Sequence, residues 1–298
     1  MAGSAGSAGS AGSAGSAGSA GNAGSMGFGW FLPDRVDLPF VTLLDSTGEP
    51  IKKNRFPLAE FPQRNWSAEW YAWLALGEYV EKAGWTGVAP PKWDDNKTPG
   101  ELDDLATAAQ DERPDALGEI LAQADEFISY FLELLTITPT SHPATVRLLN
   151  IANLIALFSV MYCKGTFKRP RPSQLCPALA PPIPVPGHSS FPSGHATQSM
   201  LMAFCLIDVL PVVPRGGLHP AANLWEQDLT VLAHRIARNR EIAGLHYPSD
   251  SDAGRKLAEN IHTQLGTLPN IAIPIPPTLP DPLPYYKYAL AKAKEEWP

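Results

Sequence analysis

The sequence predicts an all-α protein, built as a helical bundle. Several segments place apolar residues at helical spacing, whereas runs of alternating β-branched residues extend over only a few positions. Two segments, 144–163 and 194–210, are apolar on nearly every side, as expected of helices at the centre of a bundle. We therefore expect residues 26–298 to form one α-helical domain.

The predicted helices can be justified one by one along the chain. Residues 67–83 carry Trp70 and Trp73 near helical spacing. Thr98-Pro99-Gly100-Glu101 predicts a helix start with a capping box and Pro at the first helical position. The other helices are expected at 115–136, which carries one apolar stripe, at 220–243, at 250–266 after Ser249 or Asp250, and at 284–297. Pro-rich loops are expected at 166–192 and 267–283, and the length of the first indicates a functional loop.

The N-terminal residues and the apolar segments indicate where in the cell the protein is expected. Residues 1–25 repeat Ala, Gly and Ser and predict an appended flexible linker, with Met26 as the natural start. Residues 148–163 are short for a membrane span and hold two Asn, and residues 196–214 contain Gln198, Asp208 and two Pro. We therefore expect no transmembrane span. No signal peptide is visible, so a soluble protein is expected, with the cytoplasm favoured.

Charge and cysteine content narrow the function classes. The formal net charge of -7 argues against a nucleic-acid partner, for which a basic face would be expected. Three cysteines give no disulfide framework, and no zinc-binding pattern is present.

Three polar segments adjoin the predicted central helices: Lys164 to Pro172, Pro192-Ser193-Gly194-His195, and Arg240 to Asp250. The first and third contain the cations Lys164, Arg171 and Arg240, whose donors suit an oxyanion. Ser193 and Gly194 stand at the start of an apolar helix, where unpaired N–H groups attract an anion. Together these features predict an oxyanion pocket.

Two histidines and a carboxylate complete the pattern. His195 falls in the first turn of the apolar helix, and Asp250, four residues after His246, is spaced to orient that imidazole. One histidine attacking phosphorus and the other protonating the leaving oxygen would suit phosphoryl transfer. Taken singly, each segment has a structural alternative: a helix cap, a solvated loop charge or a structural histidine. Their joint occurrence favours a catalytic site.

The pattern Lys-x6-Arg-Pro, Pro-Ser-Gly-His and Arg-x5-His-x3-Asp resembles the type 2 phosphatidic acid phosphatase (PAP2) and vanadium haloperoxidase superfamily. The resemblance covers a motif core at 164–252 and is closer to the soluble bacterial-type members than to the membrane lipid phosphatases. It implies that phosphate or vanadate is bound by Lys164, Arg171, Ser193, Gly194 and Arg240. One departure is Asn239, where the family usually has Ser; we expect the pocket to survive because Asn can still donate hydrogen bonds.

The resemblance also implies roles for the remaining residues. His195 corresponds to the acid–base, His246 to the nucleophile or vanadate ligand, and Asp250 to the residue that orients His246. The segment His246-Tyr-Pro-Ser-Asp250 is similar to the phosphatase branch. His188, seven residues before His195, resembles a histidine of the bromoperoxidases that would tune halide or peroxide chemistry, with an exposed loop histidine as the alternative.

We favour a phosphate-ester hydrolase of acid-phosphatase type that acts through a phosphohistidine intermediate. The alternative is a vanadium-dependent haloperoxidase that oxidises halide with hydrogen peroxide, and the third hypothesis is an inactive oxyanion-binding protein. The hydrolase would need no cofactor, whereas the haloperoxidase would need vanadate, with His246 as its ligand. The expected partner is a small phosphorylated substrate, phosphate or vanadate; whether the chain forms a homo-oligomer stays open.

Overall fold

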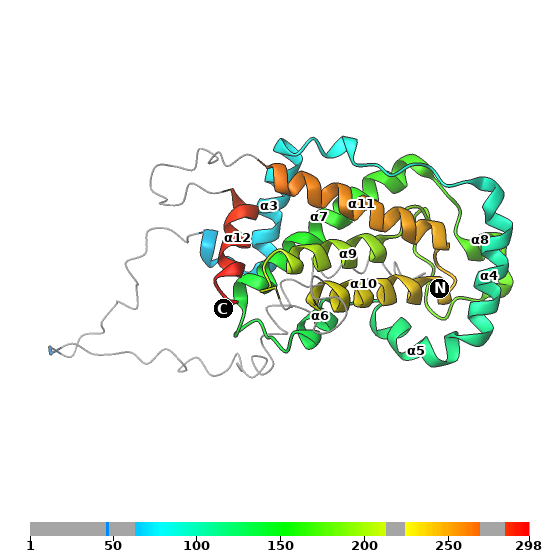
Figure 1. The fold of residues 1–298 in the computed structure, drawn as a ribbon, viewed down its shortest axis with the longest axis horizontal. Helices are drawn as coiled ribbons and strands as arrows, with labels where there is room; N and C mark the ends of the chain where they lie inside the picture. The colour runs from blue at the N-terminus through cyan, green and yellow to red at the C-terminus, as the bar shows by residue number, and fades with distance from the viewer. Residues whose placement is uncertain (1–45, 48–62, 213–223, 269–283, 298) are drawn as a thin grey trace.

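A computed structural model describes residues 46–47, 63–212, 224–268 and 284–297, which form helices and connecting loops without a strand (Figure 1). The all-α prediction is confirmed. The α-helices are α3 (Ala68–Lys82), α4 (Thr98–Asp111), α5 (Arg113–Ala122), α6 (Ile128–Leu134), α7 (Pro143–Phe167), α8 (Pro172–Leu175), α9 (Gly194–Ile207), α10 (Leu224–Ile242), α11 (Pro248–Thr267) and α12 (Tyr285–Lys294). Short 3-10 turns lie at Gln63–Asn65, Trp85–Gly87, Asp95–Lys97 and Pro177–Leu179. The predicted linker 1–25, the start at Met26 and most of the loop 267–283 lie outside the described residues.

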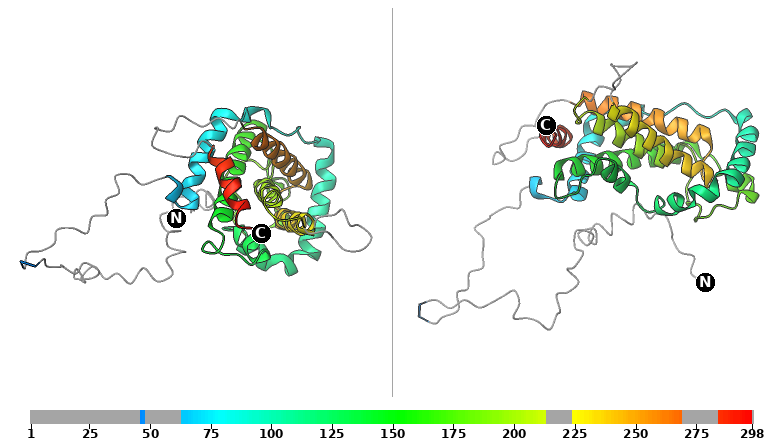
Figure 2. Two further views of the ribbon diagram at one scale, coloured as in Figure 1. Left: turned by 60° about the vertical axis from the view of Figure 1, so that its left-hand side comes forward. Right: turned by 60° about the horizontal axis from the view of Figure 1, so that its bottom comes forward.

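Helix α9 is the central element of the bundle. Helices α7, α10 and α11 all pack against it, and every residue from 196 to 203 is buried. Figure 2 shows α9 surrounded by its neighbours. A helix that is apolar on all sides must be covered on all sides, so its central place follows from its composition.

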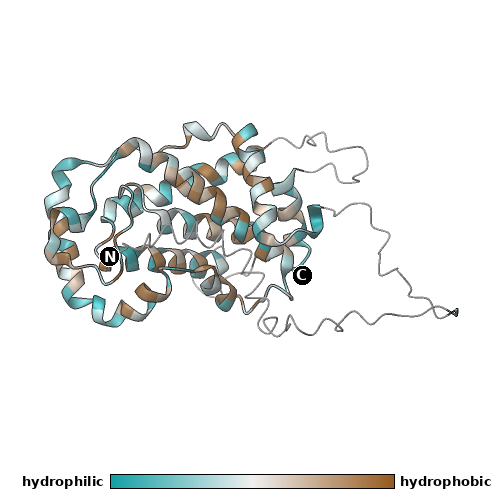
Figure 3. Cartoon of the chain, turned by 180° about the vertical axis from the view of Figure 1, so that it is seen from behind, coloured by the Kyte–Doolittle hydropathy of each residue, from teal (hydrophilic) through white to brown (hydrophobic). Residues whose placement is uncertain are grey.

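One large apolar cluster holds the bundle together. It joins buried residues of α3, α6, α7, α9, α10, α11 and α12. Hydrophobic residues lie along the helices of the bundle, with hydrophilic residues between them (Figure 3). Two smaller clusters attach α4 and α5 to the end of α10 and to the loop that follows it. Helices α4 and α5 therefore cover one end of the bundle (Figure 1).

Helix α7 is longer than the apolar segment 148–163 suggested. The stretch Pro143–Leu175 meets the length and composition criteria of a membrane span, with a mean hydropathy of 1.7, and 56% of that window is buried inside the protein. The core helix of a large bundle has the same properties, so this feature alone carries little weight. The expectation of no transmembrane span stays a prediction.

Two local predictions were wrong. The segment 115–136 is interrupted after α5, because the chain turns at Gln123 before α6 begins at Ile128. The capping box at Thr98 does not form: the Glu101 carboxylate binds Arg169 and Ser249 instead of the start of its own helix. In both places a contact with a distant segment replaces the local structure: the Gln123 carbonyl accepts from His195, and Glu101 accepts from Arg169 and Ser249.

The bundle brings four helix ends together. Lys164 lies near the end of α7, Gly194 begins α9, Arg240 lies near the end of α10 and Asp250 falls in the first turn of α11. All three predicted polar segments therefore meet at one end of the bundle.

Candidate active site

The turn before α9 has the geometry of an anion-binding helix start. Ser193 is the N-cap residue, and its Oγ accepts a hydrogen bond from the Ala196 N–H at 3.4 Å. Its own N–H donates to the Asp250 carbonyl at 2.9 Å, which ties the turn to α11. A Cβ at Gly194 would make only ordinary contacts with the protein, so packing does not require glycine there, and Gly194 lines the pocket. The free N–H groups of this first turn can therefore face a ligand.

Close packing of α11 against α9 depends on a residue that the sequence did not single out. A Cβ on Gly254 would lie 2.7 Å from the Ser193 carbonyl oxygen and 2.9 Å from Ala196 Cβ. Distances this short are not tolerated, so only glycine lets α11 approach the start of α9.

Gly244 directs the chain from Arg240 back to His246. It has a positive φ of 74°, and its N–H donates to the Glu241 carbonyl while the Leu245 N–H donates to the Arg240 carbonyl. This is the glycine-terminated helix ending in which the chain reverses sharply. It places the arginine and the histidine of the third segment in the same pocket.

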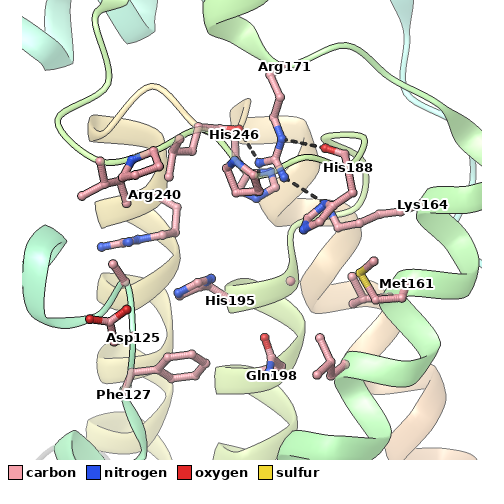
Figure 4. A pocket seen from close by; sticks show the side chains of 18 of the residues that line it. Asp125, Phe127, Met161, Lys164, Arg171, His188, His195, Gln198, Arg240 and His246 are labelled. Atoms are coloured by element: carbon pink, nitrogen blue, oxygen red, sulfur yellow. Dashed lines mark hydrogen bonds between the residues drawn. The ribbon is translucent and has the colours of Figure 1, made fainter. Parts of the chain in front are cut away.

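Three cations lie buried around one cavity of about 350 Å³ (Figure 4). Lys164 Nζ donates to the carbonyls of Ser189 and Ser190 at 2.8 and 2.6 Å. Burial, together with the charge of Arg171, lowers the pKa of Lys164 well below its ordinary value. Burial also lowers the pKa of Arg171 to about 10, a value that still leaves it charged near neutrality.

Arg240 is the least satisfied of the three cations. It is 1% exposed, and its Nη2 donates to the Ile120 carbonyl at 2.8 Å. Its Nε and Nη1 are buried and have no hydrogen-bond partner among the residues that the structure describes. Burial lowers its pKa to about 10, so the guanidinium stays charged near neutrality. Unpaired buried donors on a charged group are costly, and an anion in the cavity would satisfy them.

His246 presents one unprotonated ring nitrogen to the pocket. Its Nδ1 lies 3.1 Å from Asp250 Oδ2, and its Nε2 accepts from Arg171 Nη1 at 3.1 Å. Since a carboxylate can only accept, Nδ1 carries the proton and Nε2 keeps its lone pair. Burial and the charges of Arg171 and Lys164 lower the pKa of His246 well below its ordinary value, so the ring is neutral.

His195 is oriented through its Nε2, whereas His246 is oriented through its Nδ1. Its Nε2 donates to the Gln123 carbonyl at 2.9 Å, and its ring lies against Phe127 with centroids 4.8 Å apart. The turn at Gln123 frees that carbonyl from the helix, so the break between α5 and α6 serves the site. Burial, followed by the charge of Arg240, lowers the pKa of His195 to about 3. Its Nδ1 is left to exchange a proton in the cavity.

Asp250 is held by more groups than the sequence indicated. Its Oδ2 accepts from the Tyr247 N–H at 3.1 Å and from the Ser190 hydroxyl, in addition to His246. Its Oδ1 accepts from Arg169 at 2.6 Å. Ser190 and Arg169 are therefore parts of the site that sequence reasoning missed, and neither carries a spacing signal of its own.

His188 lies on the wall of the cavity, near Arg171 (Figure 4). Arg171 Nε donates to the His188 carbonyl at 3.1 Å, and His188 Nδ1 lies 3.1 Å from Arg171 Nη2 and 3.2 Å from the Ser189 carbonyl oxygen. Burial and the neighbouring cations lower the pKa of His188 to about 4. The structure thus places this residue on the pocket wall, in place of the exposed loop position considered as the alternative.

Asn239 has a different role from a pocket donor. Its Nδ2 donates to Glu119 Oε2 at 2.8 Å and to Gln123 Oε1 at 2.9 Å. Both acceptors belong to the end of α5 and its cap, so the side chain supports the turn that holds His195. The donors around the cavity do not include Asn239.

The rest of the cavity is mainly apolar. Its wall includes Leu121, Phe127, Leu157, Val160 and Met161. The cavity therefore offers apolar surface as well as buried cations.

Comparison with known proteins agrees with this geometry. Residues 145–261 match the family model of the PAP2 superfamily, and this segment contains all three polar motifs. The match supports assignment to that superfamily and, in general terms, a phosphatase-type enzyme. No curated protein matches the chain. Glu101, Gln123 and the helices that carry them lie outside the matched segment.

Proposed function

We propose that this protein hydrolyses phosphate monoesters through a phosphohistidine intermediate at His246. The observation that carries the proposal is the pair of buried donors on Arg240, Nε and Nη1, that have no partner within the described part of the chain. Arg240 lines a cavity shared with Lys164, Arg171 and Gly194 at the start of α9. A tetrahedral oxyanion is the ligand that would satisfy all of these groups together.

The first step follows from the orientation of the two histidines. His246 Nε2 attacks phosphorus, forming a P–N bond while the bond to the leaving oxygen breaks. That oxygen takes a proton from His195, and the alcohol leaves. His195 has a pKa near 3 because of burial and Arg240. A bound dianion would offset that positive charge and allow His195 to carry the proton it donates.

The second step reverses these roles. A water molecule attacks phosphorus and gives a proton to His195, and the electron pair of the P–N bond returns to His246 Nε2. Arg171 donates to that nitrogen in the structure, so it must turn its donor toward a phosphate oxygen when substrate binds. The three cations then neutralise the oxygens of the transition state.

We propose that the alcohol part of the substrate is compact and apolar. The organic part would lie against Leu121, Phe127 and Met161, which also line the cavity. Asp125, also on the wall, would disfavour a second negative charge on the substrate. An aryl phosphate should therefore have a higher kcat/KM than a sugar bisphosphate. Asp125→Asn removes the negative charge from the wall, so it should bring the kcat/KM values of these two substrates closer together.

The proposal is tested by measuring phosphate release from an aryl phosphate by the wild type, Arg240→Met and Arg235→Met. Arg235 lies on the same helix and pairs with Glu119 at the surface, so it is a matched control. Loss of activity in Arg240→Met alone agrees with the proposal. No hydrolysis by the wild type, although orthovanadate binds, would instead favour an inactive oxyanion-binding protein.

A vanadium haloperoxidase is the second candidate, and the place of His188 favours it. The same cations and helix start fit vanadate, a tetrahedral oxyanion, with His246 Nε2 as its ligand. When bound, vanadate would supply activation of hydrogen peroxide for halide oxidation. His188 Nδ1 contacts both Arg171 Nη2, a donor, and the Ser189 carbonyl oxygen, an acceptor, so either ring nitrogen can carry the proton, and in both tautomers the ring lies on the cavity wall beside Arg171. Bromination by the vanadate-loaded protein, without ester hydrolysis by the vanadate-free protein, would favour this candidate.

A further inference from the structure

Arg169 is fully buried behind the site and outside the lining of the 350 Å³ cavity. Its guanidinium lies 3.7 Å from the ring centroid of Tyr247 and 5.1 Å from that of Trp93. The side chain is 2% exposed, so its charge must be compensated within the protein. This residue belongs to the first polar segment, but it does not face the proposed ligand.

Two carboxylates compensate the charge, one on each side of the guanidinium. Nη1 donates to Asp250 Oδ1 at 2.6 Å, and Nη2 donates to Glu101 Oε2 at 2.9 Å. The planar fork of arginine can reach both acceptors at once, whereas a lysine ammonium has no such fixed geometry. Arg169 therefore connects the carboxylate beside His246 with a carboxylate on α4.

Glu101 fixes the far side of this arrangement. Its Oε1 accepts from the Ser249 N–H at 2.7 Å, and its Oε2 accepts from the Ser249 hydroxyl at 2.9 Å. Arg169 Nη1 also donates to that hydroxyl at 2.8 Å. Glu101 thus holds both Arg169 and the first turn of α11, in which Asp250 lies.

The consequence for Asp250 is geometric. With Oδ1 held by Arg169, Oδ2 faces Ser190, the Tyr247 N–H and His246 Nδ1. Rotation of the carboxylate would break the contacts of both oxygens at once. Loss of Arg169 would leave the buried carboxylates of Asp250 and Glu101 without their shared cation. Because two uncompensated buried charges are costly, both side chains would be expected to move.

We propose that Arg169, held in place by Glu101, is a positioning residue: it fixes the Asp250 carboxylate and thereby the Nδ1–H tautomer and ring orientation of His246. This inference rests on the proposed function only for its kinetic consequence. The tautomer itself can be observed without turnover.

The kinetic test uses Arg169→Met, Arg169→Lys and Glu101→Gln, with Arg113→Lys as the matched control. Arg113 also anchors the site end of the bundle, by donating to the carbonyls of Ile242, Leu179 and Ala180, but it contacts neither Asp250 nor Glu101 in the structure. For Arg169→Met, kcat on an aryl phosphate should fall by about 10- to 100-fold, the usual effect of losing a group that orients a site residue. Arg169→Lys should recover part of kcat, and Glu101→Gln should cause a smaller loss.

Binding separates positioning from general damage. In the proposed function Lys164, Arg171 and Arg240 bind inorganic phosphate, so its inhibition constant should stay within about 3-fold of wild type in these variants, a change of under 1 kcal/mol. A parallel loss of kcat and of phosphate affinity, or an equal loss of kcat in Arg113→Lys, would overturn the proposal.

Nitrogen-15 NMR of histidine-labelled protein provides the second readout, with the His246 signals assigned by their loss in His246→Gln. The wild type should show the Nδ1–H tautomer, and Arg169→Met should show a mixture of tautomers. Glu101→Gln should shift the same signals in the event that Arg169→Met does not fold. An unchanged tautomer in a folded variant contradicts the proposal, even if the wild type proves inactive as a hydrolase.

Discussion

His246 Nδ1 lies 3.1 Å from Asp250 Oδ2 in the first turn of α11. This contact fixes the proton on Nδ1 and leaves the Nε2 lone pair facing the cavity. The nitrogen that we propose as the nucleophile is therefore selected by a carboxylate that is not among the residues lining the cavity. The chemistry proposed for the pocket depends on this arrangement behind it.

Asp250→Asn is expected to reduce kcat by about 10³- to 10⁴-fold, as in other hydrolases whose buried aspartate orients a histidine. The amide keeps the volume of the side chain but can donate to Nδ1, which favours the opposite tautomer. Circular dichroism should show an intact helical fold. A variant with more than a tenth of the wild-type kcat would show that the carboxylate does not set the tautomer.

Orthovanadate should compete with phosphate esters because it presents the same tetrahedral arrangement of oxygens to the same donors. Arg171→Ala and Arg240→Ala should each weaken its binding by about 10- to 100-fold, the usual effect of losing hydrogen bonds from a charged group. Competition assays or calorimetry would measure this. Arg235→Ala is the control, since Arg235 pairs with Glu119 on the surface. Equal weakening in all three variants would indicate a diffuse electrostatic effect.

His188→Ala distinguishes the two candidate activities. The residue contacts Arg171 but neither His195 nor His246, so hydrolysis should change little. Bromide oxidation by the vanadate-loaded protein should fall much more, if the wild type brominates. Both activities should be measured on one preparation of the variant. Similar losses in both would mean that His188 acts only by supporting Arg171.

The ligand-free protein should lose stability as the pH falls below about 6.5. Burial lowers the folded-state pKa of His195 from 6.5 to about 3 and that of His188 to about 4. Between those values and 6.5 the unfolded chain binds more protons, so acid favours unfolding, by up to about 1.4 kcal/mol per pH unit for His195 and by less for His188, whose charge is partly screened by solvent. Urea unfolding at several pH values would measure this slope. His195→Gln should make the slope shallower, and an unchanged slope would contradict the buried, neutral state of His195.

The sequence was sufficient to predict those parts of the site that are formed by residues close together in the chain. The apolar segments predicted the helices α7 and α9, and the three motifs lie at helix ends that an antiparallel bundle must bring together. The joint occurrence of the three motifs and the family resemblance predicted one pocket for Lys164, Arg171, Arg240 and the two histidines, and all five residues line one cavity in the structure.

The supporting residues could not be predicted because their contacts join distant segments. Glu101 has the spacing of a capping box, but its partner Ser249 lies 148 residues away. Gln123 falls inside a continuous apolar stripe, yet its carbonyl binds His195, 72 residues along the chain. Only the packed structure shows that contacts with the site replace the local structures that these two patterns predict.

The most direct test of the proposed function is a single-turnover reaction with a ³²P-labelled aryl phosphate, quenched in alkali within milliseconds. Label should appear on the protein, resist alkali, be released by acid and map to the peptide that contains His246. His246→Ala should show no label while keeping its helical fold. Full turnover by His246→Ala, or hydrolysis by the wild type without a labelled protein at any time, would contradict the phosphohistidine mechanism.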